Sequence, residues 1–359
     1  MTRTYVIAEA GVNHDGSVDD ALRLIDAASD AGADCVKFQT FRADALASRF
    51  AEKAAYQKSA TDPAQSQQEM LRQLELPASA YPRLIKRAQE RRVEFLSTPF
   101  DPMSVDFLIR DLGMKRIKIG SGDMNNAPML LEVAKAGCEV ILSTGMADLA
   151  EVEEALSVLA FGYAANTEQP SRARFATAWQ RSAVRASLQG KVTLLHCTSA
   201  YPAHPETVNL KAMTTLAEHF GLPVGYSDHT LGIEVSMAAV ARGAVMIEKH
   251  LTLDVGRSGP DHAASLEPRA FAQMTAGIRI VEAALGDGRK IPNDVERSTA
   301  TVARKALVTA RAIEAGESFT AENIALKRPA HGMAPIAFWD VIGKMAKRAY
   351  GPDEAIDPP

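Results

Sequence analysis

The sequence predicts an α/β protein, a (β/α)8 TIM barrel followed by a small C-terminal domain. Eight short, apolar, β-rich runs alternate with segments whose apolar residues recur at helical spacing. The runs end in polar or small residues, at the position where barrel strands carry their chemistry. The turn after the first run reads GVNHDG and lacks the GxGxxG pattern of a doubly wound open sheet, which is the main alternative.

The eight predicted strands follow one another through the first 251 residues. They are YVIAEAG (5–11), CVKFQT (35–40), EFLSTPF (94–100), RIKIGSG (116–122), EVILSTG (139–145), KVTLLHC (191–197), VGYSDHT (224–230) and VMIEKHL (245–251). Alternation with helices implies parallel strands joined by right-handed crossovers, and eight such units close into a barrel.

Helical segments lie between most of these strands. ALRLIDAASDAG follows the first run and SVDFLIRDLGM the third, and Gly32 and Gly137 mark two helix ends. Two connections are unusually long, residues 41–78 and residues 161–189, and the second has a partly helical pattern. Long barrel loops commonly form functional lids or packing appendages, so we expect one of these roles for each.

The chain divides into a barrel domain at 1–285, a linker at 286–297 and a C-terminal domain at 298–359. Glycine, proline and charged residues cluster in GDGRKIPNDVERST, which is typical of a linker. The final segment is too short for a large core of its own. We therefore expect it to pack on another surface, such as that of a second subunit.

Composition excludes several classes of protein. Apolar residues make up 47% and charged residues 23% of the 359 residues, which is ordinary for a globular protein. The net charge of −4 argues against a nucleic-acid or acidic-membrane partner, which would need clustered Lys and Arg. No secretory signal or apolar run of about 18 residues is present. Three widely spaced cysteines, Cys35, Cys138 and Cys197, favour a reduced, cytoplasmic location.

Polar side chains gather where the predicted strands end. The carboxyl ends of barrel strands meet at one rim, so these side chains are expected to form a single site. They are Glu9, Lys37, Gln39, Thr98, Lys118, Ser121, Ser143, His196, Ser227, His229, Glu248 and His250.

Two histidines close the seventh and eighth predicted strands. His229 and His250 would stand on adjacent strand ends, near enough for both imidazoles to reach one Mn²⁺, Zn²⁺ or Co²⁺ ion. The alternative is a pair of hydrogen-bonded pocket histidines without a metal. Asp228 is expected either to orient an imidazole from behind or to cap its strand.

A cationic set lies at the same rim. Lys37 and Lys118, with Arg257 as a third member, could bind a substrate that carries phosphate and carboxylate groups. Hydroxyl and backbone donors from KIGSG and LSTGM suit an anion nest. The alternative is that each lysine pairs with a barrel carboxylate such as Glu9 or Glu248.

Carboxylates supply the remaining chemistry. The candidates for general acid or base, or for binding sugar hydroxyls, are Glu9, Asp123, Glu248 and Asp261. His196 and Cys197 are consecutive in a strand and should face opposite sides, which argues against a Cys–His nucleophile. Tyr201 either lines the pocket or packs in its loop.

Nine motifs together resemble one family. AEAGVNHDG, VKFQT, STPFD, KIGSGD, LSTGM, HCTSAYP, GYSDHT, EKH and GPDH occur in the order found in sialic acid synthases, the family of N-acetylneuraminate, legionaminic and pseudaminic acid synthases. GESFTAENIALKRP resembles their C-terminal antifreeze-protein-like (SAF) domain. The resemblance covers essentially the whole chain.

The resemblance implies roles for individual residues. His229 and His250 match the metal ligands, and Mn²⁺ is the expected ion, with Mg²⁺ or Co²⁺ as alternatives. The implied phosphoenolpyruvate site consists of Lys37, Thr98, Lys118, Ser121, Ser143 and Ser227. The implied sugar contacts are Gln39, Asp123, Tyr201, Glu248, Asp261 and Arg328. Asp123 stands where bacterial members often have Glu, and the long connections at 41–78 and 161–189 depart from the family pattern.

The implied reaction condenses phosphoenolpyruvate with the open-chain aldehyde of N-acetylmannosamine to give N-acetylneuraminate and phosphate. The alternative acceptor is the diacetamido-trideoxy-mannose that leads to N,N'-diacetyllegionaminate. Glu9 is expected to stabilise the cation that develops or to guide the attacking water. Arg328 would reach the partner's active site in a domain-swapped homodimer.

Two functions of other classes stay open at this point. The barrel could be idle while the C-terminal domain binds a sugar or polymer. Alternatively, the barrel could be an aldolase that uses a Schiff-base lysine and no metal. Insensitivity to a chelator together with borohydride trapping would favour the aldolase.

Overall fold

The computed structural model describes residues 3–54, 57–58, 61–62, 64–165 and 168–358. The chain forms two compact units, Met1–Gly286 and Asp287–Pro359, each with its own apolar core. Parts of both long connections lie outside the described residues. None of the described helices has the length and apolar character needed to cross a bilayer.

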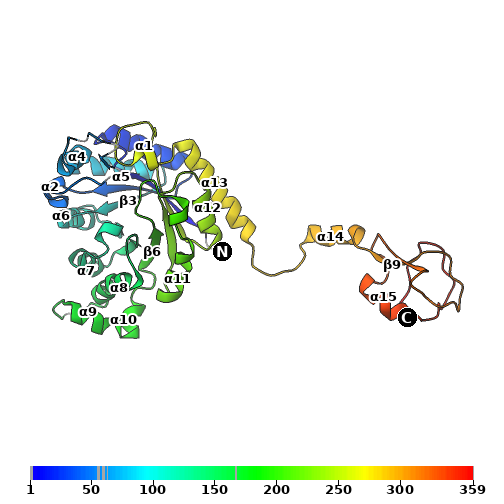
Figure 1. Cartoon of the computed structure of the whole chain (residues 1–359). Coiled ribbons are helices and arrows are strands. Elements are labelled where there is room, and N and C mark those ends of the chain that lie inside the picture. Colours follow the sequence, from blue (N-terminus) through cyan, green and yellow to red (C-terminus); the bar gives the residue numbers. More distant parts are fainter. Residues whose placement is uncertain (1–2, 55–56, 59–60, 63, 166–167, 359) are drawn as a thin grey trace. The chain divides into compact units, whose positions relative to one another are not determined.

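The first unit is an eight-stranded parallel sheet curled into a nearly closed barrel (Figure 1). Its strands are β1 (Tyr5–Gly11), β2 (Cys35–Thr40), β3 (Glu94–Pro99), β4 (Arg116–Ile119), β5 (Glu139–Ser143), β6 (Val192–Cys197), β7 (Val224–Asp228) and β8 (Met246–His250). Every strand lies within a predicted run. The order β3-β2-β1-β8-β7-β6-β5-β4 joins β1 to β8 and leaves the seam between β3 and β4. The predicted (β/α)8 barrel is confirmed.

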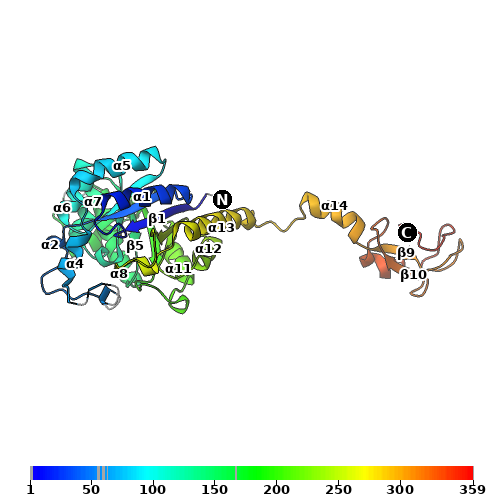
Figure 2. The same cartoon turned by 90° about the horizontal axis from the view of Figure 1, so that it is seen from above.

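Helices surround the strands, and Figure 2 shows α1 and α13 side by side on one flank. The covering helices are α1 (Val18–Asp30), α5 (Tyr81–Glu90), α6 (Pro102–Asp106), α7 (Ala127–Lys135), α8 (Leu149–Tyr163), α11 (Lys211–Phe220), α12 (Glu234–Ala241) and α13 (Pro268–Leu285). In α1 the Ser17 side chain caps the first turn, while Leu24 and Ile25 are fully buried. Gly32, with φ of +78°, ends this segment as predicted.

Alternation along the strands fills the barrel in layers. One buried apolar cluster consists of Ile7, Cys35, Leu96, Ile141, Leu195 and Met246. Strand side chains repeat with a period of two, so the next inward residue lies two positions toward the carboxyl end. Those residues are Glu9, Lys37, Thr98, Ser143, Cys197 and Glu248. The barrel therefore has an apolar floor and a polar layer directly above it.

The two long connections contain additional helices. The first holds α2 (Ala43–Leu46) and α4 (Gln67–Leu74), and the second holds α9 (Arg172–Trp179) and α10 (Ser182–Ala186). A capping box between Ser66 and Glu69 starts α4. Met70 and Leu74 of α4 pack with Val12 in a small cluster of their own. The helical pattern predicted for residues 161–189 is therefore confirmed in its described part.

The second unit contains α14 (Asp294–Ala303), β9 (Ala306–Thr309), β10 (Ile324–Lys327) and α15 (Phe338–Val341). β9 and β10 pair antiparallel. Its core includes Leu307, Phe319 and Ile356. α14 begins inside the segment predicted as linker, because Asn293 and Glu296 form a capping box there.

Candidate active site

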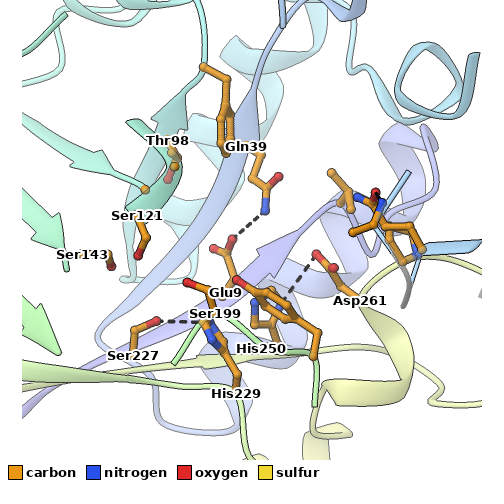
Figure 3. Close-up of a pocket in the computed structure, with 18 of the residues that line it drawn as sticks. Glu9, Gln39, Thr98, Ser121, Ser143, Ser199, Ser227, His229, His250 and Asp261 are labelled. Atoms are coloured by element: carbon orange, nitrogen blue, oxygen red, sulfur yellow. Dashed lines mark hydrogen bonds and ion pairs between the residues drawn. The ribbon is translucent and has the colours of Figure 1, made fainter. Parts of the chain in front are cut away.

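A cavity of about 470 Å³ opens at the carboxyl ends of the barrel strands (Figure 3). It gathers most of the predicted site residues from distant parts of the sequence. The predicted residues that line it are Glu9, Lys37, Gln39, Thr98, Lys118, Ser121, Ser143, Tyr201, Ser227, His229, Glu248, His250 and Asp261. The strand ends therefore converge on one site, as barrel geometry requires.

Two buried lysines share carboxylates at the bottom of the cavity. Lys37 Nζ lies 2.5 Å from Glu9 Oε2 and 3.6 Å from Glu248 Oε2, while Lys118 Nζ lies 3.4 Å from Glu248 Oε1. Lys37 also donates to Thr98 Oγ1 at 3.2 Å, and Ser227 Oγ donates to Glu248 Oε1 at 2.8 Å. The lysine–carboxylate pairing considered from the sequence is thus present in the free protein.

The charged groups of this layer shift one another's pKa values. Burial works against the charged form of Lys37, but Glu248 and Glu9 raise the pKa of this lysine overall. Burial lowers the pKa of Lys118. Lys118 and Lys37 outweigh burial at Glu248 and hold its carboxyl pKa below the usual range. Burial raises the pKa of Glu9. Glu248 is therefore the firmly ionised partner, and Glu9 is the carboxylate that takes up a proton more readily.

His229 and His250 stand side by side, with their ring centroids 5.6 Å apart. His229 Nδ1 lies 2.7 Å from the carbonyl oxygen of Thr198, so Nδ1 carries the proton and Nε2 keeps its lone pair. His250 Nδ1 is buried without a hydrogen-bond partner and lies 3.8 Å from Asp261 Oδ2. Burial lowers the pKa of both imidazoles, which favours their neutral, ligating form.

This pair of imidazoles fits a divalent metal ion. Both imidazoles line the cavity, and His250 Nδ1 is buried without a hydrogen-bond partner, which suits metal ligation. The described residues contain no group of three or more His, Cys, Asp or Glu side chains with metal-binding geometry. The site would therefore supply two protein ligands and leave the other positions to water or substrate.

The segments that follow β4 and β5 lie close together at the rim of the barrel. Ser121 Oγ accepts from the Gly145 amide at 3.0 Å and lies 3.1 Å from Cys197 Sγ. A Cβ at Gly145 would come within 2.4 Å of Ser199 Oγ and 2.8 Å of both Cys197 Sγ and Ser121 Oγ. A larger residue here would force at least one of these three side chains to shift.

Gln39 and Asp261 line the upper part of the cavity. Gln39 Nε2 donates to Glu9 Oε1 at 3.1 Å (Figure 3). Burial, assisted by the charge of Glu9, raises the pKa of Asp261 to about 7. The Tyr201 ring lies against His229 at a centroid separation of 4.2 Å and a tilt of 36°, and Tyr201 lines the cavity, the first of its two expected positions.

Several residues singled out from the sequence lie elsewhere. Asp228 faces outward and pairs with Lys249 at 3.0 Å, so it does not orient an imidazole. Arg257 pairs with Asp20 at 3.0 Å and is absent from the described cavity lining. His196 also faces outward, with Nε2 2.6 Å from the Val208 carbonyl oxygen. Strand alternation explains Asp228 and His196, since each adjoins an inward-facing residue.

One further predicted contact is not part of the cavity, and another belongs to the second unit. Asp123 is half-buried, accepts from Asn126 at 3.0 Å and does not line the cavity. Burial raises the pKa of its carboxyl. Arg328 is exposed in the second unit, immediately after β10.

Other lining residues were not identified from the sequence. They are chiefly small or apolar, and include Cys197, Ser199, Phe100 and Met146 as well as Leu46, Ala47, Met70, Leu71 and Leu74 from α2, α4 and the residues beside them. Cys197 could have been found by counting two residues beyond Leu195. The α2 and α4 residues give no such signal, since a loop's path over the barrel is not periodic.

The sequence matches two family models. The model described as the NeuB family matches residues 24–290, and the SAF domain model matches residues 304–359. The N,N'-diacetyllegionaminic acid synthase of Campylobacter jejuni is 46% identical over 99% of this chain and 99% of its own length. The protein of the same description from Legionella pneumophila is 43% identical over 94% of this chain and 89% of its own length.

A solved structure shares the architecture. The N-acetylneuraminic acid (sialic acid) synthetase of Leptospira borgpetersenii, crystallised with citrate, matches with a TM-score of 0.68 and 32% identity. The match covers 83% of this chain and 90% of that one. The architecture of this chain therefore has a counterpart in a solved structure.

Proposed function

Since this chain belongs to the NeuB family, we propose that it condenses phosphoenolpyruvate with 2,4-diacetamido-2,4,6-trideoxymannose to give N,N'-diacetyllegionaminate and phosphate. It is a phosphoenolpyruvate-dependent synthase of sialic-acid-type acids with a TIM barrel and a SAF domain. One observation supports the acceptor: 46% identity along 99% of both this chain and a legionaminic acid synthase. N-acetylmannosamine, the principal acceptor expected from the motifs, is less well supported.

In this proposal Lys37 and Lys118 hold the phosphate and carboxylate of phosphoenolpyruvate. The carboxylates of the site favour the charged form of these lysines: Lys37 lies against Glu9, and Lys118 lies against Glu248, which opposes the effect of burial on its charge. Ser143 Oγ is buried without a hydrogen-bond partner in the described structure and supplies a further donor. Thr98, Ser121 and Ser227 complete the list of expected contacts. Fixing both reactants contributes orientation as well as charge.

The reaction joins C3 of phosphoenolpyruvate to the aldehyde carbon of the open-chain sugar. The π electrons of the enol form the new bond, and the aldehyde oxygen takes up a proton and becomes a hydroxyl. Water adds at C2, and the resulting tetrahedral intermediate expels phosphate to leave the keto acid. Glu9 stabilises the positive charge at C2 and accepts the proton of the water, which agrees with the raised pKa of its carboxyl.

We also propose a bound divalent ion, Mn²⁺ first and Mg²⁺ or Co²⁺ as alternatives, held by His229 and His250. The neutral imidazoles and the unpartnered His250 Nδ1 support it. Such an ion polarises an aldehyde as a Lewis acid when it is bound. Gln39, Tyr201, Glu248 and Asp261 would then contact the sugar from the cavity wall. Asp123 does not line the cavity, so its proposed sugar contact has no support from the described geometry.

A metal-ligand variant tests this assignment. His250→Ala should abolish metal-dependent turnover and weaken Mn²⁺ binding by at least about 10-fold, since half of the protein ligands are lost. Electron paramagnetic resonance titration of Mn²⁺ measures binding without relying on activity. Near-normal turnover and affinity in the variant would remove the metal assignment.

The assembly proposed is a domain-swapped homodimer in which Arg328 contacts the N-acetyl group at the partner's site. This rests on the family resemblance, and on the exposed position of Arg328 in its own unit. We propose a cytoplasmic location for the same chain. The three cysteines, all described, are unpaired thiols, which suits a reducing compartment.

The proposed function is tested by phosphate release from phosphoenolpyruvate in the presence of Mn²⁺. Each acceptor sugar is offered separately, product mass is determined, and a chelator serves as the control. Release with the diacetamido sugar at the higher kcat/KM is expected. A preference for N-acetylmannosamine would reassign the chain to N-acetylneuraminate synthesis, and no release with either sugar would remove the assignment.

A further inference from the structure

The two acceptors under consideration are identical at the reacting end and differ at the far end. Both present an aldehyde at C1 and an acetamido group at C2. N-acetylmannosamine has hydroxyls at C4 and C6, whereas the trideoxy sugar has an acetamido group at C4 and a methyl group at C6. Any residue that distinguishes them must therefore face C4 to C6. This inference rests on the proposed function and identifies the part of the cavity that distinguishes between the two acceptor sugars.

The closed floor of the cavity restricts where the far end of the sugar can point. Its floor is closed by the apolar cluster that contains Ile7, Leu96 and Met246. Lys37 and Lys118 lie directly above this floor, so the anionic reactant occupies the deepest part. The aldehyde must meet that reactant beside His229 and His250. Atoms C4 to C6 then extend toward the mouth.

One wall of the cavity comes from the connection between β2 and β3. It consists of the lining residues of α2, α4 and their flanks and is here called the α2–α4 wall: Leu46, Ala47, Ala54, Gln57, Gln67, Met70, Leu71 and Leu74. Within the described part of residues 41–78, this wall presents aliphatic side chains and two amides but no charged group to the cavity.

The α2 and α4 parts of the α2–α4 wall are anchored by hydrogen bonds and by burial. Glu75 Oε1 accepts from the Ala43 amide at 2.5 Å, and Asp101 Oδ2 accepts from the Arg42 amide at 2.9 Å. Met70 and Leu74 are almost completely buried in the cluster with Val12. A fixed surface can select by shape and polarity, because it does not rearrange to suit each ligand.

We propose that the α2–α4 wall is the acceptor-specificity element and selects a 6-deoxy, 4-acetamido sugar. Its aliphatic side chains contact the C6 methyl and the methyl of the C4 acetamido group, and the amide of Gln57 or Gln67 pairs with the acetamido group itself. Hydroxyls at C4 and C6 would lose water against the aliphatic side chains, and among the described residues of this wall only the amides of Gln57 and Gln67 could bind them. Apolar pockets reject an added hydroxyl only moderately, so we expect about 10- to 100-fold discrimination in kcat/KM.

The test compares kcat/KM for three acceptors in matched variants. The sugars are the diacetamido-trideoxy sugar, N-acetylmannosamine and 2-acetamido-2,6-dideoxymannose, which separates the C6 from the C4 contribution. Leu71→Asn and Leu46→Asn each place an amide in the half-buried wall. Phe50→Asn is the control, since Phe50 belongs to the same connection, is 79% exposed and does not line the cavity.

Either wall variant should reduce the preference for the diacetamido-trideoxy sugar over N-acetylmannosamine by about 10-fold, with the KM for phosphoenolpyruvate unchanged. Phe50→Asn should keep the wild-type preference. If the wild type prefers the diacetamido sugar and both wall variants keep that preference, the wall assignment is wrong while the proposed function stands. If the wild type prefers N-acetylmannosamine or uses neither sugar, the proposed function and the wall assignment both fail.

Discussion

Lys37 and Lys118 show how one residue can meet a structural and a functional demand. A buried ammonium group is costly without an anion, and here Glu9 and Glu248 provide that anion in the free protein. The same arrangement places two cations where an anionic substrate is expected. The two interpretations weighed from the sequence, internal pairing and anion binding, are therefore compatible. When an anionic substrate binds, its charged groups would replace the carboxylates of Glu9 and Glu248 as partners of the two lysines.

His14 should make stability depend on pH. The ring is fully buried, Nδ1 accepts from the Gly16 amide at 3.0 Å, and Nε2 has no hydrogen-bond partner. Burial lowers the pKa of His14 to about 4. The unfolded chain takes up this proton near pH 6.5, before the folded protein does, so stability is lost as pH falls from about 6.5 toward 4.

At pH 5 this group should cost about 2 kcal/mol of the unfolding free energy relative to neutral pH. Urea unfolding at pH 5 and pH 7.5 measures the loss. His14→Gln serves as the comparison, because it removes the titrating group and should show a smaller loss. An equal loss in both proteins would show that other groups carry the pH dependence.

Gly145→Ala should impair the phosphoenolpyruvate site. The new methyl group would come within 2.4 Å of Ser199 Oγ and 2.8 Å of Cys197 Sγ, so the Ser121–Gly145 contact must open. We expect the KM for phosphoenolpyruvate to rise about 10-fold, equivalent to about 1.4 kcal/mol. Steady-state kinetics measures it, and the double variant with Ser199→Ala should recover part of the loss. An unchanged KM in the single variant would contradict the role of this close approach.

At the scale of elements, β7 and β8 bring the two histidines together. Asp228 and Lys249 are register partners on these strands, are fully buried, and pair on the outer face at 3.0 Å. Asp228 also accepts from Ser236 Oγ at 2.6 Å, which ties β7 to α12. Each member of the pair precedes a predicted metal ligand in the chain. The ion pair on the outer face thus helps to fix the register of β7 and β8, and with it the relative position of His229 and His250.

Lys249→Met should destabilise the barrel by about 3–5 kcal/mol, because it leaves the Asp228 carboxylate buried and without its cation. Denaturant unfolding gives the loss in free energy. The double variant Lys249→Met with Asp228→Asn removes both charges and should be less destabilised than the sum of the two single changes. Additive losses would indicate that the two residues act separately.

At the scale of the whole molecule, the proposed exchange between subunits makes a prediction about mixtures. His250→Ala inactivates the barrel of its own chain but keeps Arg328. Arg328→Ala keeps an intact barrel but removes the arginine. If Arg328 acts at the partner's site, a mixed dimer holds one complete site. Refolding the two inactive variants together should restore about one quarter of wild-type activity after random pairing.

Phosphate release after co-refolding measures this recovery. The two variants mixed without refolding are the control for slow subunit exchange. Full inactivity of the refolded mixture, in a sample whose dimers are verified by light scattering, would mean that Arg328 acts within its own chain or not at all. High activity of Arg328→Ala alone would remove this residue from the site.

Much of the fold and many of the proposed site residues could be predicted because they depend on local periodicity. A strand alternates with a period of two whatever surrounds it, so Ile7 followed by Glu9, or Met246 followed by Glu248, already indicates a core residue and then a rim residue. The same rule placed His196 and Cys197 on opposite faces. It also predicts the outward position of Asp228, because the adjacent Ser227 faces inward.

The sequence by itself determined the barrel, the order of its strands and the residues that meet at its rim, because these follow from alternation and from parallel topology. Only the tertiary structure decided that Glu248 serves both lysines, that Arg257 pairs with Asp20, and that the α2–α4 wall lines the cavity. Those relations join residues far apart in the chain. They depend on strand register, barrel closure and the path of a loop, none of which leaves a periodic signal in the sequence.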